Sequence, residues 1–386
     1  MDFALDDETR NLQRKVRQVV NETLKPLDAA IEREGRIPDD ALNAIRDLGL
    51  FGSHTPAVYG GLGLDMLGNS LVIMEMARAH IAYFYTYSMN VHIASKGIEL
   101  HGSEEQRRRW LPDLASGNAI GCYALTEEGA GSDAAAVKTT ALPSDGGYVL
   151  NGRKRYITNA PIADLFTVFA ATDVDQGTNK SLSAFVIGRD TPGLAIGEIC
   201  QMAGGRGAYH SEVVLTNCRV SVEDRIGGEG DGFAIAMSCL DAGRINWAAY
   251  CVGAAKNLFD MTLDHVTARR QFGRPLSDNQ GVQWMLADMA ADLHAARLVC
   301  YEAARSYETE PENRPLIGAR AKLICSEMVG RIADQAVQLF GGDGYRKDLP
   351  VERIWREVRA IRILEGTSEI MRHIIARDTL RSAQRR

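Results

Sequence analysis

A glutamate beside a glycine near the C-terminal end of the chain could act as a general base. Glu365 follows Leu364 and is followed by Gly366 and Thr367, at the junction of a loop and a helix. A carboxylate in such a place can lie desolvated over a ligand, which raises its pKa and makes it a stronger base. A solvent-exposed glutamate that caps a helix is the more common meaning of this motif taken alone. Both interpretations stay open for this segment.

A loop of small residues, from Tyr123 to Asp133, could hold a cofactor or a thioester. Its glycines let backbone N–H groups approach a ligand, and the hydroxyls of Thr126 and Ser132 can bond polar atoms of a flavin ring or of a thioester carrier. A plain surface turn fits the same residues. The loop is neither a G-x-G-x-x-G fingerprint nor a Walker loop, which disfavours a Rossmann-type dinucleotide site.

An Asn-Gly pair predicts a tight hairpin between two strands. Asn151 and Gly152 are residue types that adopt the positive φ values of a type I′ turn. Tyr156, Ile157 and Thr158 would close this hairpin, where the aromatic ring could stack on a flavin and the threonine hydroxyl could bond its edge. Ordinary strand packing is the alternative for these residues.

Two further segments carry charges. Asp241 and Arg244 are three residues apart in a helical pattern and share one face, a spacing that usually means a surface ion pair. The run from Arg269 to Gly273, followed by Gln280, offers guanidinium and amide groups suited to a pyrophosphate. A basic helix end that complements the helix dipole is the alternative for this run.

The composition excludes several functional classes. The chain has 386 residues, 45% of them hydrophobic, so it can bury a large core and form two or three domains. A formal net charge of -6 gives no basic field for nucleic acid. The seven cysteines form no C-x-x-C pair and no grouping with histidines, so we expect no metal site and a reducing compartment.

The ends and the apolar runs of the chain bear on its location. The N-terminus is acidic and lacks the positive and apolar regions of a secretion signal. No apolar run approaches the roughly 20 residues needed to span a bilayer, so no membrane association is expected. We expect a cytoplasmic protein, although a mitochondrial matrix enzyme without its transit peptide would look similar.

Three regions must position these groups. Residues 1–117 carry helical periodicity and predict an N-terminal helical domain. Residues 118–230 alternate with period two and predict a central β domain. Residues 231–386 are helical again, and apolar residues from Ile317 to Leu339 recur every three or four positions, which predicts one buried helix of a bundle. The strand-like runs are 167–172, 183–187 and 211–215.

Taken together, five segments resemble the acyl-CoA dehydrogenase family in identity, order and spacing, over nearly the whole chain. The resemblance implies a mainly α fold with a central β domain: an N-terminal helical domain, a middle barrel-like or sandwich-like β domain and a C-terminal four-helix bundle. It also implies a homotetramer, a dimer of dimers. The segments are Tyr123–Ser132, Tyr156–Thr158, Arg269–Gly273, Gln338–Tyr345 and Glu365–Ile370.

The resemblance implies that the protein binds FAD. The residues implied to contact the isoalloxazine or ribityl part are Tyr123, Leu125, Thr126, Tyr156 and Thr158, with Ser132 and Ile157 as further candidates. Thr367 and Glu369 are implied to lie near the phosphates and the adenosine. The FAD held mainly by a neighbouring subunit would be bound by Arg269, Gln271, Phe272, Gln280, Gln338 and Gly342.

The same resemblance implies an acyl-CoA substrate. Ser132, Asp241 and Arg244 match positions that touch the CoA portion, and Gly366 lies beside the thioester. The backbone N–H of Glu365 and a ribityl hydroxyl would bond the thioester carbonyl and stabilise enolate-like charge. Glu365 would then abstract the pro-R α-proton while a hydride leaves Cβ for flavin N5, giving a trans-2-enoyl-CoA. Reoxidation in the family normally uses an electron-transfer flavoprotein.

Four features of this sequence depart from the family pattern. A branch of the family places its base on the long helix at a position that is Gly243 here, which leaves Glu365 as the base consistent with the family. Tyr156 stands where tryptophan is common. His210 replaces a small hydroxyl residue, and we favour a structural role for it over a substrate contact. The segment from Tyr83 to Met89 is unusually aromatic, and its bulk would favour a short, branched or cyclic acyl group unless the rings are simply core.

Alternatives remain on the same fold. An acyl-CoA oxidase, or an enoyl-CoA reductase that runs the reaction backwards, would carry the same motifs. A non-catalytic flavoprotein that binds nucleic acid is a further alternative, against which the net charge of -6 and the presence of Glu365 both argue.

Overall fold

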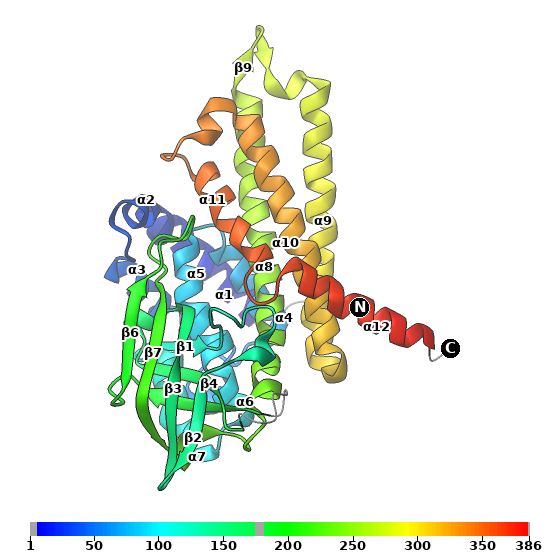
Figure 1. Ribbon diagram of the computed structural model, residues 1–386. Helices are drawn as coiled ribbons and strands as arrows, with labels where there is room; N and C mark the ends of the chain where they lie inside the picture. Colours follow the sequence, from blue (N-terminus) through cyan, green and yellow to red (C-terminus); the bar gives the residue numbers. More distant parts are fainter. Residues whose placement is uncertain (1–5, 174–180, 385–386) are drawn as a thin grey trace.

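The computed structural model describes residues 6–173 and 181–384, which form three regions in the order helices, sheet, helices. Figure 1 shows the sheet beside the N-terminal helices at one end of the molecule, with the long C-terminal helices extending well beyond both. The predicted mainly α fold with a central β domain is confirmed. The N-terminal helices end at Ser116, the eighth strand ends at Ile226, and the next helix begins at Gly232.

Of the N-terminal helices, α1, α4, α5 and α7 begin at side chains that cap them. Asp6 Oδ1 accepts the backbone N–H of Thr9 at 2.6 Å, and Ser103 and Gln106 form a reciprocal capping box at the start of α7. α4 and α5 are buried on all sides, because their sequences are apolar or aromatic all round. The helices are α1 (Asp7–Val19), α2 (Lys25–Glu34), α3 (Asp39–Asp47), α4 (Met66–Met76), α5 (Ile81–Ser88), α6 (Lys96–His101) and α7 (Glu104–Ser116).

The described part of the middle region forms an eight-stranded sheet. Its strand order is β6-β7-β3-β2-β4-β5-β8, and β1 lies beside β4 in parallel. The three predicted strand-like runs lie in β4, β5 and β7, so these predictions are confirmed. The strands are β1 (Gly121–Ala124), β2 (Thr140–Ser144), β3 (Gly147–Thr158), β4 (Leu165–Ala171), β5 (Leu182–Gly188), β6 (Leu194–Ile199), β7 (His210–Ser221) and β8 (Arg225–Ile226).

The predicted Asn-Gly hairpin is wrong. Asn151 and Gly152 lie inside β3, and the chain turns instead between β2 and β3 at Asp145 and Gly146. Gly146 has a φ of +75°, which glycine adopts without steric cost. At Gly152 a Cβ would lie 2.2 Å from Thr139 Oγ1, and the pairing of β3 with β7 shifts register here. Glycine is therefore needed at this position for a close approach between segments, and not for a turn.

Long helices dominate the C-terminal region and lie side by side in Figure 1. The helix predicted over 317–339 is confirmed by α10. A two-stranded arm joins α8 to α9 and projects from the far end of these helices, while α12 extends away from the body (Figure 1). None of the described helices has an apolar stretch long enough to cross a membrane. The elements are α8 (Gly232–Ala268), β9 (Arg270–Gln271), β10 (Arg274–Pro275), α9 (Gln280–Thr309), α10 (Arg314–Phe340), α11 (Pro350–Arg359) and α12 (Ser368–Gln384).

The N-terminal and C-terminal helices share one hydrophobic core, although a whole domain separates them in sequence. Val72 of α4, Phe84 of α5, Ala248 of α8 and Ile332 of α10 are buried members of this cluster. The sheet has a cluster of its own, and a third cluster joins the sheet to α6, α7 and the start of α8. Groups near α5 and α8 are therefore held at the junction of all three regions.

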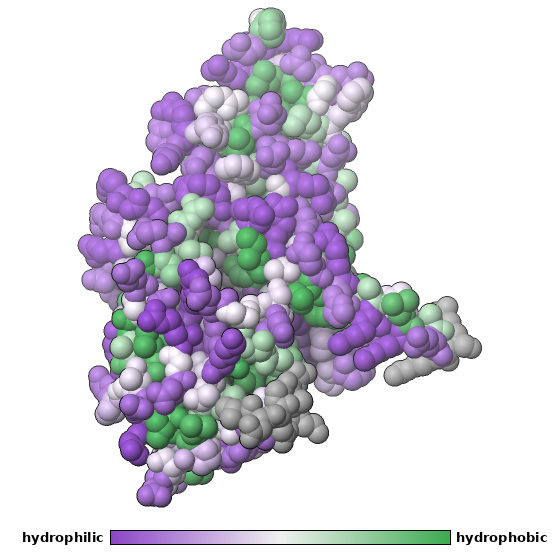
Figure 2. Space-filling view, viewed as in Figure 1, coloured by the Kyte–Doolittle hydropathy of each residue, from purple (hydrophilic) through white to green (hydrophobic). Residues whose placement is uncertain are grey.

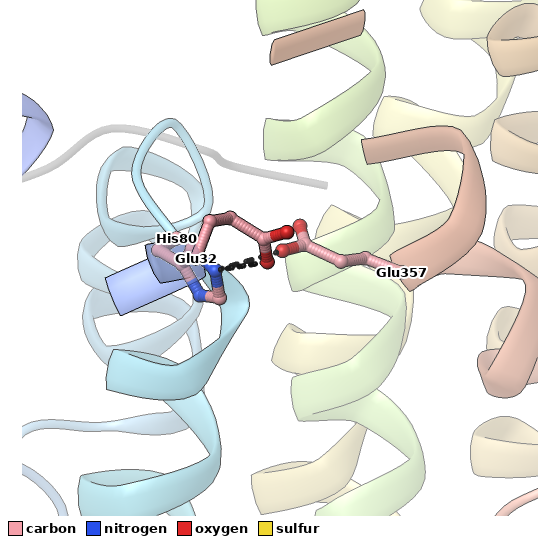
Figure 3. A group of neighbouring side chains, drawn as sticks. All are labelled: Glu32, His80 and Glu357. Carbon is pink, nitrogen blue, oxygen red and sulfur yellow. Dashed lines mark hydrogen bonds and ion pairs between the residues drawn. The ribbon is translucent and has the colours of Figure 1, made fainter. Parts of the chain in front are cut away.

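Ion pairs also tie α11 to the N-terminal helices. Figure 3 shows Glu32 of α2 and Glu357 of α11 approaching the imidazole of His80, which precedes α5. His80 Nε2 lies 3.0 Å from Glu32 Oε1 and 3.5 Å from Glu357 Oε1. His80 Nδ1 accepts the backbone N–H of Ala82 at 3.1 Å, so we assign the ring proton to Nε2, where it faces both carboxylates.

The carboxylates of this cluster are paired with cations of the chain itself. Arg353 Nη1 lies 3.1 Å from Glu357 Oε1, and Arg356 Nη2 lies 3.1 Å from Glu32 Oε2. Ligand atoms of Glu32, His80 and Glu357 are close enough for a metal ion, within 4.8 Å of one another. Because arginines and the imidazole proton occupy those oxygens, the arrangement is an ion-pair network that docks α11 onto α2 and α5.

Candidate active site

Glu365 lies in a strained loop immediately before α12. Its φ is +49°, a left-handed conformation that is unfavourable for a residue with a side chain, and Gly366 follows with a φ of +98°. Such a conformation costs about 1–3 kcal/mol and persists only where its surroundings enforce it. Thr367 Oγ1 accepts the backbone N–H of Ile370 at 3.3 Å, so Thr367 caps the start of the last helix.

Lys322 of α10 binds this loop through its side chain. Its Nζ donates hydrogen bonds to the carbonyl oxygens of Leu364 and Gly366, the residues on either side of Glu365. Only 1% of Lys322 is exposed, and this burial lowers its pKa to about 8. Because this buried ammonium group bonds the carbonyls on both sides of Glu365, it fixes the backbone there. The position of the Glu365 Cα, from which the side chain extends, is fixed with it.

The carboxylate of Glu365 points into the protein. Its Oε1 accepts the indole N–H of Trp247 at 2.7 Å, whereas Oε2 is buried and has no hydrogen-bond partner. The residue as a whole is partly buried, but Oε2 itself is buried, and the burial of the carboxylate decides its chemistry. The glutamate is therefore not a solvent-exposed helix cap.

The space for this carboxylate is provided by Gly243 of α8. A Cβ at Gly243 would lie 2.3 Å from Glu365 Oε2, so any side chain there would displace the carboxylate. Desolvation raises the pKa of Glu365, while the hydrogen bond from Trp247 and the charges of Lys322 and Arg244 lower it, and the rise prevails. An orphaned, desolvated carboxylate oxygen with a raised pKa is suited to accept a proton.

Asp241 and Arg244 form a buried ion pair, not a surface one. Arg244 Nη1 lies 2.9 Å from Asp241 Oδ1, and the two residues are 4% and 7% exposed respectively. Burial raises the pKa of Asp241 to about 6, because the loss of hydration outweighs the attraction of the guanidinium. Arg244 Nε is also buried without a partner. Arg244 therefore has a hydrogen-bond donor left for a ligand, and its charge acts on Glu365 nearby.

The small-residue loop leaves β1 directly beside this pair. The hydroxyl of Tyr123 donates to the carbonyl of Ala236 at 3.1 Å, and burial raises the pKa of Tyr123, with the charges of Glu365 and Arg244 nearby. A Cβ at Gly129 would meet no atom within 4 Å, and none at Gly131 either, so this part of the loop is open. Thr126 is partly buried and Ser132 is exposed on it.

A buried lysine anchors the start of this loop. Lys154 Nζ donates to Glu127 Oε1 at 2.7 Å and to the carbonyl of Phe169 at 2.6 Å. Its burial lowers its pKa to about 8, while the Glu127 carboxylate partly offsets this. Glu127 in turn accepts the backbone N–H of Thr139 at 3.0 Å. Gly129 and Gly131, which have open space beside them, therefore follow a segment that Glu127 and Lys154 hold in place.

Tyr156 and Thr158 lie at the end of β3, where its pairing with β7 is irregular. Tyr156 has a φ of +58° and its ring is 47% exposed, with the Arg155 guanidinium 4.9 Å from the ring centroid. Thr158 Oγ1 lies 3.0 Å from Nδ1 of His210, a buried ring. Burial lowers the pKa of His210 to about 4, so the imidazole is neutral near pH 7. His210 is therefore a partner of Thr158.

A row of side chains connects Glu365 with Thr158. Trp247 bonds the glutamate, the Tyr85 ring lies 5.3 Å from the Trp247 ring, and the His210 ring lies 5.1 Å from the Tyr85 ring. Tyr85 and His210 are 6% and 7% exposed. The aromatic segment from Tyr83 to Met89 thus contributes Tyr85 to a wall of rings beside Glu365.

A second group of the predicted residues lies far from Glu365 in the same chain. The arm that projects from the long helices (Figure 1) presents Phe272, which is 99% exposed with a φ of +52°. The exposed predicted residues at that end of the chain's helices are Arg269, Gln271, Gln280, Gln338 and Gly342. One chain therefore does not bring these residues together with those around Glu365.

The residues near Glu365 fit an FAD molecule. A flavin is a flat ring with polar edges, and Tyr156 offers a half-exposed ring in a strained conformation beside the Thr158 hydroxyl. The open glycines at 129 and 131 leave room for a bulky group next to that ring's loop. Leu125 and Ile157 are buried beneath these positions, and Thr367 and Glu369 lie at the start of α12, whose N-terminus favours phosphate.

Sequence reasoning missed three residues of the site. In the sequence Trp247 is one aromatic residue beside the alanines of α8, and nothing marks it as functional. Lysines such as Lys322 and Lys154 are normally expected at the surface. Lys322 lies between apolar or small residues, in Ala321-Lys322-Leu323-Ile324, and that pattern is the signal that could have found it. Lys154 stands between Arg153 and Arg155, which gives no such signal. No local signal identifies Trp247 as a partner of a residue more than 100 positions away.

Comparisons with known proteins agree with this arrangement. Family models described as the N-terminal, middle and C-terminal domains of acyl-CoA dehydrogenase match residues 6–118, 122–218 and 230–380. The chain is 38% identical over 376 residues to the short-chain-specific acyl-CoA dehydrogenase of Clostridium acetobutylicum, which covers 97% of this chain and 99% of that relative.

Two further similarities bear on function. The chain is 37% identical over 385 residues to the acryloyl-CoA reductase (NADH) of Anaerotignum propionicum, covering 99% of this chain and 96% of that relative. The solved structure of butyryl-CoA dehydrogenase from Megasphaera elsdenii is similar with a TM-score of 0.94 at 34% identity, over 98% of this chain and 100% of that chain.

Substituting Gly243 tests the geometry of the carboxylate. In Gly243→Ala the new methyl group would overlap Glu365 Oε2 and Ile93 Cδ1, so we expect the glutamate side chain to turn away and the free energy of unfolding to fall by about 1–3 kcal/mol. A crystal structure and thermal denaturation measure both effects. Gly281→Ala on α9 is the control, because its methyl group meets nothing within 4 Å. A variant with an unmoved carboxylate and unchanged stability would contradict the geometry.

Proposed function

Because this chain belongs to the acyl-CoA dehydrogenase family, we propose that it oxidises an acyl-CoA thioester between Cα and Cβ with FAD, and that Glu365 removes the α-proton. The observation that carries this proposal is the buried Oε2 of Glu365, which has no partner and a raised pKa. A proton acceptor of this kind is what the first step of α,β-dehydrogenation requires.

Different residues of the chain would have different roles in this reaction. Glu365 would accept the α-proton, and its backbone N–H would donate to the thioester carbonyl, which stabilises the negative charge that develops there. The two bonds from Lys322 to the flanking carbonyls keep that N–H and the side chain in one fixed relation. Asp241 and Arg244 would contact the CoA portion, together with Ser132 and Gly366. Positioning of this kind matters because small displacements of a base are costly.

FAD supplies the acceptor for the hydride that leaves Cβ. Tyr123, Thr126, Tyr156 and Thr158 would bind its ring and ribityl chain, with Leu125 and Ile157 beneath them. Thr367 and Glu369 would lie near its phosphates and adenosine. The remote set, Arg269, Gln271, Phe272, Gln280, Gln338 and Gly342, would bind FAD of another subunit.

The remote residues support an oligomer. Phe272 is almost fully exposed on a projecting arm and has a positive φ, so its ring is held away from its own chain, where another surface can reach it. Figure 2 shows apolar patches at the end of the long helices that carries the arm, as well as others near the middle of this face and over the sheet. A homotetramer built as a dimer of dimers would bring each arm to a neighbour's cofactor. An electron-transfer flavoprotein as acceptor and a cytoplasmic location are further parts of the proposal.

The aromatic wall supports a short acyl group. An acyl chain between Glu365 and Thr158 would run along Trp247, Tyr85 and His210, whose rings are packed and nearly fully buried. Phe84 backs the wall, with its ring 4.9 Å from that of Trp247. Close packing of this kind leaves no room for a long chain without moving several rings. We therefore favour a short linear or branched acyl group.

A reductase is the second candidate. The similarity to acryloyl-CoA reductase (NADH) over nearly the whole chain favours it, because both directions use the same proton and hydride positions. The distinction rests on the partner that exchanges electrons with the flavin.

Replacing the base tests the central proposal. We expect Glu365→Gln to retain FAD and bind acyl-CoA, but to reduce the flavin about 10²–10⁴-fold more slowly, because the amide cannot accept the α-proton. Anaerobic stopped-flow bleaching of the flavin by butyryl-CoA measures this rate. Glu302→Gln on α9 is the matched control, because that glutamate is exposed and remote. Reduction at the unaltered rate in the first variant would refute the assignment.

A substrate panel tests the wall. Steady-state assays of turnover with butyryl-, isobutyryl-, octanoyl- and palmitoyl-CoA should give kcat/KM values that fall by about tenfold or more from the short to the long chains, since each poorly accommodated methylene costs about 1–3 kcal/mol. Equal or higher values for palmitoyl-CoA would show that the wall does not limit the chain.

The electron partner separates the candidates. For a dehydrogenase, we expect the acyl-CoA-reduced flavin to be reoxidised rapidly by an electron-transfer flavoprotein and slowly by air. Rapid reoxidation by air would instead identify an oxidase, and reduction of acryloyl-CoA by NADH in the presence of the protein and its flavoprotein partner would identify a reductase. Stopped-flow absorbance of the flavin follows all three reactions.

A further inference from the structure

Trp247 donates the hydrogen bond that the carboxylate of Glu365 accepts. Its Nε1 lies 2.7 Å from Oε1, and no other hydrogen bond to this carboxylate occurs within residues 6–173 and 181–384. Trp247 is 3% exposed, so water does not compete for the indole N–H. A hydrogen bond to a charged acceptor in such surroundings is among the stronger ones in proteins.

The direction of this N–H is fixed by aromatic neighbours. The ring of Trp247 lies 4.9 Å from that of Phe84, 5.3 Å from that of Tyr85 and 5.7 Å from that of Tyr250, with interplanar angles of 79°, 64° and 69°. These edge-on contacts come from two helices, α5 and α8, and prevent the indole from turning. The hydrogen-bond donor is therefore preorganised and does not depend on a ligand.

We propose that Trp247 is the positioning residue of the base: it anchors Oε1 of Glu365 so that Oε2 faces the substrate. This inference rests on the proposed role of Glu365. A carboxylate can rotate about its terminal bond, and an unanchored one would spread its two oxygens over several orientations. With Oε1 bound to the indole and Oε2 lying over Gly243, one orientation is selected before the substrate binds.

The same bond sets how readily the base takes up a proton. Donation to the charged form lowers the pKa of Glu365, against the rise caused by burial. The other titratable groups facing the carboxylate are Lys322 of α10, Arg244 of α8, Tyr123 of β1 and Tyr85 of α5. Burial raises the pKa of both tyrosines, and Lys322 titrates only near a pKa of about 8. Asp241, whose pKa burial raises to about 6, also titrates on the acid side of neutrality, but its partner is Arg244. A shift of the acidic limb on loss of the indole N–H therefore belongs to Glu365, which accepts that N–H.

The variant Trp247→Phe tests the anchor, because it keeps an aromatic ring and removes the N–H. We expect flavin reduction by butyryl-CoA to slow by about 10- to 100-fold at its optimum, with little change in the dissociation constant of the acyl-CoA. We also expect the acidic limb of the rate profile to move to higher pH, because the carboxylate loses a donor and is protonated more readily. Trp110→Phe, the same change on α7 away from the site, should leave the rate and the profile unaltered.

A second measurement reports the contact without turnover. The chain has four tryptophans, so the FAD-loaded protein labelled with 5-fluorotryptophan should give four ¹⁹F signals, and the one lost in Trp247→Phe belongs to Trp247. That signal should shift with pH as Glu365 is protonated, and Glu365→Gln should abolish this shift. The signals of the other three tryptophans serve as internal controls for folding.

The outcomes separate the two proposals. An unchanged rate and an unchanged acidic limb in Trp247→Phe, or a Trp247 signal that ignores both pH and Glu365→Gln, would overturn the anchor while leaving the base in place. Full flavin reduction by Glu365→Gln would overturn the base itself, and the anchor with it.

Discussion

The site depends on keeping one carboxylate out of water in a backbone conformation that disfavours it. Glu365 adopts a φ of +49°, and the cost of this strain is met by Lys322, which bonds the carbonyls on either side. The side chain then enters a space that exists only because residue 243 has no side chain. Burial without full pairing is destabilising, and here it leaves a carboxylate oxygen ready to accept a proton.

Electrostatic balance explains why three cationic or donor groups surround the carboxylate without neutralising it. Burial favours the protonated form of Glu365, and a protonated base cannot act. Trp247, Lys322 and Arg244 oppose that rise, but only Trp247 makes direct contact. Lys322 and Arg244 have partners of their own, in backbone carbonyls and in Asp241. Their charges therefore lower the pKa of Glu365 from a distance, and Oε2 keeps no hydrogen-bond partner among the described residues.

Much of the fold could be predicted from the sequence, because it follows from local periodicity. The helix over 317–339 and the three strand-like runs could be recognised directly from the spacing of their apolar residues. The Asn-Gly pair failed as a predictor because a glycine can serve either a turn or a close approach. Only the position of Thr139 against Gly152 decides between them, and that contact belongs to the tertiary structure.

The same limit applies to the site. Glu365, Asp241 and Arg244 could be singled out by residue type, but the surface ion pair suggested by their spacing proved to be buried. Trp247 and Lys322 escaped notice because their roles come from the residues they meet on distant segments. Periodicity shows which face of a helix is buried, and it does not show what lies against that face.

The position of the site at a junction explains how a loop can be held so firmly. Glu365 comes from the C-terminal region, Tyr85 from the N-terminal helices and Thr158 from the sheet, so each must be placed by contacts outside its own region. The shared core of the N-terminal and C-terminal helices places α5 against α8. The network of Glu32, His80 and Glu357 then docks α11, which leads directly to the glutamate loop (Figure 3). Breaking one member of such a buried network costs about 3–5 kcal/mol, so the loop is restrained at its N-terminal side by α11 and from below by Lys322. Because the loop of Glu365 is restrained from two sides, the glutamate loses little conformational freedom when substrate binds. Only under this condition can the hydrogen bond at Oε1 fix the orientation of Oε2.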